Sequence, residues 1–167
     1  MADRHWTSAE QKVINKLQTI SKVRLFQDLN EATVEEFGEK VYEVISAHSR
    51  ATNILNYVLK HKQLAEHKYE DKKSILKIGR EVLLREHKEI RLKHTKREKE
   101  DMADYLMRGE VRELDELKMA LSKLKALEEM ARNIVKDCEI RKQGSTQQIK
   151  LFCNLHNISW SGGEFSN

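Results

Sequence analysis

Residues 114–138 read LDELKMALSKLKALEEMARNIVKDC, and this stretch decides the fold class. Its apolar residues recur in alternating steps of three and four, interrupted once by Glu128: Leu114, Leu117, Leu121, Leu124, Ala131, Val135 and Cys138. A period of 3.5 residues is typical of a helix that winds around a second helix in a left-handed coiled coil. The stretch therefore predicts a long helix with one narrow apolar stripe, which another helix must cover.

A second seam with the same period lies earlier in the chain. It starts at Phe37 and continues through Val41, Val44, His48, Ala51, Leu55 and Val58, after which Lys62 and Lys72 occupy seam positions. Apolar residues return only between Ile75 and Leu84. We therefore expect an all-α protein, an elongated coiled coil with a short N-terminal helix and a small, incomplete C-terminal segment of helix plus strand.

Three capping boxes, in which a hydroxyl side chain and a Glu or Gln three residues later satisfy each other's backbone donors, divide the chain. They begin at Thr7, Thr33 and Ser145, and Gly144 is placed to end the helix before the third box. The chain contains no proline, so long helices have no strong breaker, and Gly109 marks a bend. The predicted segments are an N-terminal helix in residues 1–32 that ends near Asn30, a long helix with broken heptads in 33–108, a leucine-rich coiled coil in 109–143, and a short helix, from Gln147 to Leu155, with a tail in 144–167.

The partner helix is supplied either by another chain or by the same chain folding back. The length of the seams and the high charge favour another chain, so we expect a hetero-oligomer with a coiled-coil protein. The residues predicted to bind this partner are Val41, Val44, Leu55, Val58, Leu114, Leu117, Leu121, Leu124, Ala131 and Val135.

The composition argues against most other classes of protein. Charged residues make up 35% of the chain and the hydrophobic set 39%, which is little for a compact core with a concave active site. The sequence has no phosphate-binding glycine loop, nucleophile elbow or paired carboxylates, so we expect neither an enzyme nor a cofactor or small-molecule substrate. His87 and His94 share a helix face but are two turns apart, too far to bind one metal ion together. No signal peptide or membrane span is evident, which predicts a nuclear or cytoplasmic protein with Cys138 and Cys153 as free thiols.

A basic stretch, residues 85–99, offers a nucleic-acid alternative. Seven lysines or arginines occur in residues 85–100, where only Ile90 and Leu92 are apolar. Four interleaved glutamates and the lack of aromatic residues for base stacking favour a solvated helix face instead. Nucleic-acid binding is therefore kept as an alternative function, and not as the expected one.

Residues 149–160, IKLFCNLHNISW, resemble the start of the globular head in the smaller Spc-type coiled-coil subunit of the outer-kinetochore microtubule-binding complex. In that family a parallel coiled coil leads into a head that opens with a helix and a strand carrying an isoleucine-x-tryptophan step, as in Ile158-Ser159-Trp160. The resemblance implies a structural subunit that acts in chromosome segregation at the nuclear kinetochore, with head contacts by Phe152, Leu155, Ile158 and Trp160. The family's head continues for several more strands, whereas this sequence stops seven residues after Trp160, so the resemblance implies a truncated or divergent head. A vesicle-tethering or cytoskeletal coiled-coil adaptor is the alternative.

Overall fold

The computed structural model describes residues 6–161 and 164–166, with side chains up to Ile158. Five helices follow in order: α1 (Ser8–Ser21), α2 (Val34–Glu86), α3 (Lys88–Arg91), α4 (Lys96–Leu106) and α5 (Arg108–His156). The long helices α2 and α5 pack together, and the chain divides into two compact units. The first unit comprises residues 1–58 and 127–167, and the second comprises residues 59–126. The prediction of a helical protein with long helices and a short N-terminal helix is confirmed.

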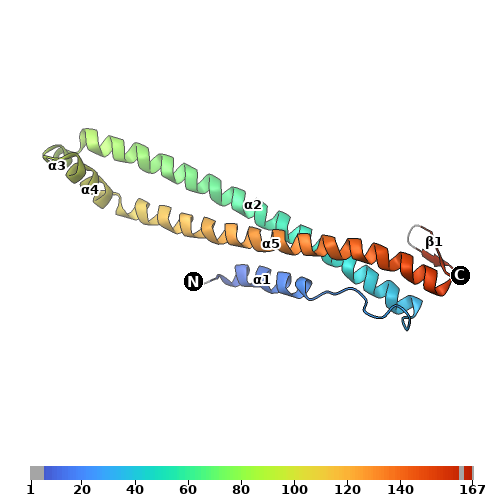
Figure 1. The fold of residues 1–167 in the computed structure, drawn as a ribbon. Coiled ribbons are helices and arrows are strands. Elements are labelled where there is room, and N and C mark those ends of the chain that lie inside the picture. Colours follow the sequence, from blue (N-terminus) through green and yellow to red (C-terminus); the bar gives the residue numbers. More distant parts are fainter. Residues whose placement is uncertain (1–5, 162–163, 167) are drawn as a thin grey trace. The chain divides into compact units, whose positions relative to one another are not determined.

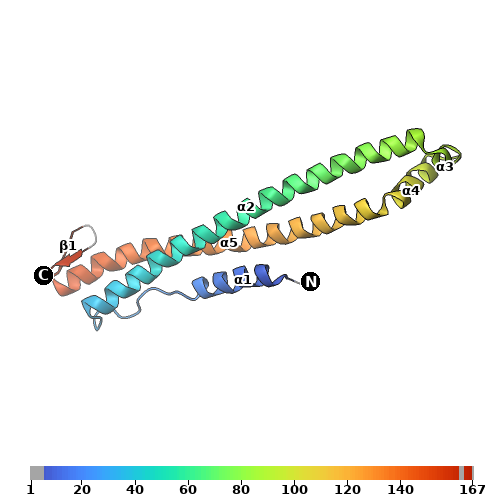
Figure 2. The same ribbon diagram turned by 180° about the vertical axis from the view of Figure 1, so that it is seen from behind.

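In the first unit, α1 lies alongside the N-terminal part of α2 and the C-terminal part of α5, as Figures 1 and 2 show from opposite sides. Three apolar clusters join the helices. Each contains residues from α1 or the segment after it, from α2 and from α5. One centres on Ile14, Val58 and Leu127, and the next on Ile20, Val44 and Cys138. The third joins Phe37 of α2 to Phe152 of α5, whose rings stack with centroids 4.3 Å apart. The seam of α2 is thus covered by the same chain, which is the fold-back alternative.

Helix α1 begins where the sequence predicts, because Thr7 and Glu10 form the expected capping box. The expectation that this helix continues to about Asn30 is wrong, since it ends at Ser21. The segment 22–33 instead finds backbone partners on α5. The side-chain amide of Gln148 donates to the carbonyl oxygen of Phe26 at 2.7 Å, and His156 Nε2 lies 3.1 Å from the carbonyl oxygen of Leu29.

Helix α5 continues through the predicted break at Gly144 and Ser145. The prediction of a separate helix that starts after a third capping box is therefore wrong. Gly144 is there for close approach, because a Cβ atom at this position would lie 2.9 Å from Cδ1 of Leu25. Ser145 is only 2% exposed, and its hydroxyl has no hydrogen-bond partner in the described part of the chain. Both residues face the segment after α1, which explains why neither ends the helix.

In the second unit the chain reverses direction through α3 and α4, which Figure 1 shows where α2 and α5 are connected. We call residues 87–99 the reversal segment. The expected long helix over 33–108 is thus interrupted, because α2 ends at Glu86 and α4 starts at Lys96. Ile90 is fully buried and anchors the turn. The break before α5 falls at Met107 rather than at Gly109, which lies inside α5.

After α5 the chain forms a small antiparallel hairpin of two strands, β1 (Ser159–Ser161) and β2 (Glu164–Ser166). Trp160 pairs with Phe165 in its register. Asn157, the first residue after α5, has a φ of 54°, the left-handed conformation that commonly ends a helix. The sequence Ser161-Gly162-Gly163 also predicts a turn, and its two glycines lie outside the described residues.

Replacing Ser145 by alanine should stabilise the chain, because it removes a buried hydroxyl without a partner and shortens the side chain by only one heavy atom. Such a group costs about 1–3 kcal/mol, and alanine is also the better helix former. The free energy of unfolding in urea, measured by circular dichroism, should therefore rise by at least about 1 kcal/mol. Ser122→Ala, at an exposed position of the same helix, is the control for helix propensity alone. Equal gains in the two variants would contradict the role assigned to the orphan hydroxyl.

Candidate interaction surface

The two units differ sharply in how they treat their apolar residues. The first unit buries an apolar set that includes Leu17, Phe37, Ala51, Ala131 and Phe152, whereas the described part of the second unit buries only Leu76, Ile90, Ala103 and Met107. Both units expose large apolar side chains, in the first unit among them Tyr42, Tyr57, Ile140, Leu151 and Leu155. The second unit, which has the smaller core, exposes Leu64, Ile75, Ile78, Val82, Leu92, Tyr105, Leu106 and Met119. Exposed apolar residues that gather on one face indicate an interaction site.

Four of these exposed residues lie on one face of α2. Ile75, Ile78 and Val82 are spaced i, i+3 and i+7, and Leu64 precedes Ile75 by three turns, which places all four on the same side of a helix. We call them the outer stripe. Ile78 is 63% exposed, so more than half of its side chain meets solvent. The stripe has the width and spacing that a partner helix covers, although Lys68 and Asp71 interrupt it.

A second face of α2, about a third of a turn around the helix from the outer stripe, holds the second unit together. Leu76 is buried there, and two ion pairs flank it at a spacing of four residues in either direction. Lys72 Nζ lies 2.5 Å from a carboxylate oxygen of Glu113 on α5, and Arg80 pairs with Asp104 on α4. Gly79 allows a further close approach, because a Cβ atom there would lie 2.7 Å from Cε of Met107. The outer stripe therefore lies beside the residues that bind α2 to α4 and α5, and its four side chains remain exposed.

The structure distributes the predicted seam residues over both units. Those of the first unit lie in its apolar clusters: Val44, Val58 and Ala131 are buried, Val41 and Val135 pack against the clusters, and Leu55 is half-buried. Those of the second unit, Leu114, Leu117, Leu121 and Leu124, are half-buried. Their assignment to a partner chain stays a prediction. The outer stripe itself was not among the predicted site residues, although its spacing was visible in the sequence.

The residues named from the head resemblance have different surroundings. Phe152 is fully buried against Phe37, and Ile158 packs on the same cluster. Leu155 is exposed, and the side chain of Trp160 lies outside the described residues. Of these four residues, only Leu155 is described as open to solvent.

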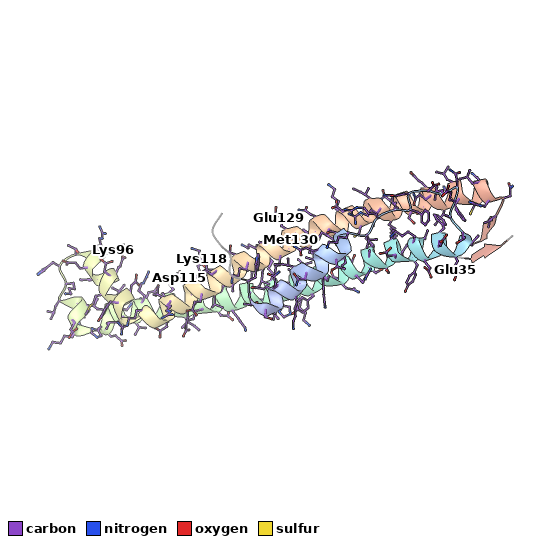
Figure 3. The ribbon with its side chains drawn as sticks, turned by 90° about the horizontal axis from the view of Figure 1, so that it is seen from below. Glu35, Lys96, Asp115, Lys118, Glu129 and Met130 are labelled. Atoms are coloured by element: carbon purple, nitrogen blue, oxygen red, sulfur yellow. The ribbon has the colours of Figure 1, made fainter. Side chains whose placement is uncertain are left out.

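The reversal segment gathers cations on the surface. Residues 91–98 are all exposed, and Lys96 points away from the ribbon in Figure 3. Thr95 and Glu98 form a capping box that starts α4, with the Thr95 backbone N–H donating to Glu98 Oε2 at 3.0 Å. This box was not among the predicted ones, although Thr95-Lys96-Arg97-Glu98 fits the same pattern as the boxes at Thr7 and Thr33. The predicted box at Thr33 is formed, because the Glu36 N–H donates to the Thr33 hydroxyl at 3.2 Å.

Other chemistries find little support among the described residues. No group of three or more histidine, cysteine, aspartate or glutamate side chains is placed there to bind a metal ion, and no helix is long and apolar enough to cross a membrane. Cys138 and Cys153 are buried free thiols, as predicted. Burial raises the pKa of the Cys138 thiol, which keeps it protonated and poorly nucleophilic.

Comparisons with known proteins add no family. No protein-family model, no curated protein and no solved structure matches this chain. The case for a function therefore depends on the surfaces described above.

Two of the acidic capping residues, Glu36 and Glu98, should make the starts of α2 and α4 sensitive to acid. Hydrogen bonds from the backbone and side chain of Thr95 lower the pKa of Glu98 below 4.5, and Thr33 does the same for Glu36. A carboxyl group with a lowered folded-state pKa stabilises the fold above its unfolded pKa and loses this effect as the pH falls through the folded value. We therefore expect both helix starts to fray as the pH drops below about 4.5.

Carboxyl NMR titration of Thr95→Ala should show the pKa of Glu98 rising, with that of Glu36 unchanged as the internal control. Alanine keeps the backbone N–H at position 95, so an unchanged pKa of Glu98 would contradict the contact with the Thr95 hydroxyl.

Proposed function

We propose that this chain is a non-catalytic structural subunit that joins a larger assembly by pairing its outer stripe with a helix of another protein. The observation that carries the proposal is the contrast between the units. The first unit covers its own seams, whereas α2 in the second unit presents Leu64, Ile75, Ile78 and Val82 to solvent. Pairing through this face leaves the packing of α2 against α4 and α5 intact.

The size of the outer stripe suits a partner helix that adds contacts of its own. Complete burial of an aliphatic side chain contributes about 1.5–3 kcal/mol, and these four are roughly half exposed, so covering them contributes on the order of 4 kcal/mol. Association must also offset the loss of translational and rotational freedom, which is of similar size or larger. The stripe therefore supports pairing within an assembly that has further contacts better than an isolated two-chain complex.

The assembly that we propose is the outer kinetochore, where the chain would act in chromosome segregation. The resemblance of residues 149–160 to the head entry of the smaller Spc-type subunit supports this placement. A vesicle-tethering or cytoskeletal adaptor would use the same stripe. The identity of the proteins that co-purify with the chain from dividing cells separates these assemblies.

Ile78→Asp should break the pairing and leave the chain folded, because the aspartate is solvated in the free chain and buried without a partner in the complex. We expect the amount of co-purified partner to fall at least tenfold, on the order of 1.4 kcal/mol. Met119→Asp is the matched control, since Met119 is 65% exposed in the same unit and lies outside the outer stripe. Quantitative mass spectrometry after affinity purification, with circular dichroism to check folding, measures both.

Two outcomes would contradict the proposal in different ways. Equal recovery of partners with Ile78→Asp and with the wild type would show that the outer stripe is not the interface. If Ile78→Asp loses co-purified proteins of vesicles or microtubules, with no kinetochore protein among them, the proposed interface stands and the proposed kinetochore assembly is rejected.

A further inference from the structure

We propose that the reversal segment of the second unit is a binding surface for the phosphate backbone of duplex nucleic acid. The inference is independent of the outer stripe and starts from the cations that the chain reversal concentrates. Lys88, Arg91, Lys93, Lys96 and Arg97 lie within ten consecutive residues, and all five are exposed.

These cations are only weakly paired with their acidic neighbours. Lys88, Arg91 and Lys93 form no ion pair with the described residues. Lys96 and Arg97 approach acidic groups of the same helix only at 3.9 and 4.0 Å, the outer limit for an ion pair. Their side chains remain 90% and 92% exposed, and such surface pairs contribute little. All five charges are therefore available to a polyanion.

One of the glutamates that argue against nucleic acid in the sequence, Glu98, points toward the backbone in the structure. Glu98 receives hydrogen bonds from the backbone N–H groups of His94 and Thr95, at 3.2 and 3.0 Å. Its carboxylate is thus held at the start of α4. Glu89 is the one acidic residue between Lys88 and Arg97, and Glu98, Glu100 and Asp101 follow this stretch.

The apolar residues of the segment favour duplex phosphate over other polyanions. Ile90 is buried, and Leu92, at 69% exposure, is the single apolar side chain that the segment offers to a ligand. Membrane-surface helices need a broad apolar face in addition to charge, and one leucine does not supply it. Residues 85–99 contain no aromatic side chain for stacking on unpaired bases, which disfavours single strands. Duplex backbones need only positive charges at accessible positions.

The test compares two triple variants of the full chain with equal net charge. The first variant reverses three charges of the reversal segment with Arg91→Glu, Lys93→Glu and Lys96→Glu. The second reverses the charges of three exposed lysines of the first unit with Lys12→Glu, Lys16→Glu and Lys150→Glu. Binding to a fluorescent DNA duplex of about 24 base pairs is followed by anisotropy over a range of salt concentrations. Five phosphate contacts give a slope of log affinity against log salt of up to about −4.5, and loss of three reduces its size by about 2.7.

We expect the reversal-segment variant to bind the duplex at least tenfold more weakly than the wild type, and the first-unit variant to stay within threefold. Leu92→Ser should bind the duplex as the wild type does. Equal loss in both triple variants would overturn the inference, because the attraction would then come from net charge alone. Absence of duplex binding by the wild type, with binding to phosphatidylserine vesicles that Leu92→Ser weakens, would overturn it in favour of a membrane surface.

Discussion

The structure depends on the covering of one narrow apolar seam on α2 by α5 and α1. Small residues make this possible: Ala51 and Ala131 are fully buried, and Gly144 lets Leu25 approach the backbone of α5. Helices with small side chains at their contact pack at short distances, so a thin seam can still exclude water. The stacked rings of Phe37 and Phe152 close one end of this packing, and the cluster at Ile14 closes the other. Without α5 and α1, the α2 seam would be exposed to solvent.

The second unit lacks this covering, and its sequence explains why. Lys72 and Arg80 occupy positions on the inward face of α2 where the first unit has Val44, Ala51 and Val58. Ion pairs to Glu113 and Asp104 therefore replace apolar packing, and exposed ion pairs contribute little to stability. The apolar residues Ile75, Ile78 and Val82 lie instead on the outside. The same helix thus stabilises the fold in one unit and offers a surface in the other.

Local signals in the sequence predicted helix type and some helix starts, but not what surrounds them. The period of three and four predicted α2 and α5, and the boxes at Thr7 and Thr33 are formed. The same pattern forms no box at Ser145 but forms one at Thr95, where none was predicted. A capping box can form only where the chain turns away from the helix axis. Ser145 is buried against the segment after α1, whereas Thr95 lies on the surface. The seam also has the same period whether its partner is another chain or a fold-back, so the covering helix could not be predicted.

The position of the chain reversal and the surface charge there have one common cause. Between Arg85 and Glu100 the sequence supplies only Ile90 and Leu92 for burial, so a continuous helix in this region has no seam to hold it against a neighbour. The chain instead buries Ile90, and Thr95 starts α4 with Glu98 as its capping partner. A count of charges treats Glu98 as a neutraliser of the nearby lysines. In the folded chain its carboxylate also accepts hydrogen bonds from backbone N–H groups and starts α4, so the absence of apolar residues that breaks the helix also places the cations of the reversal segment on the surface.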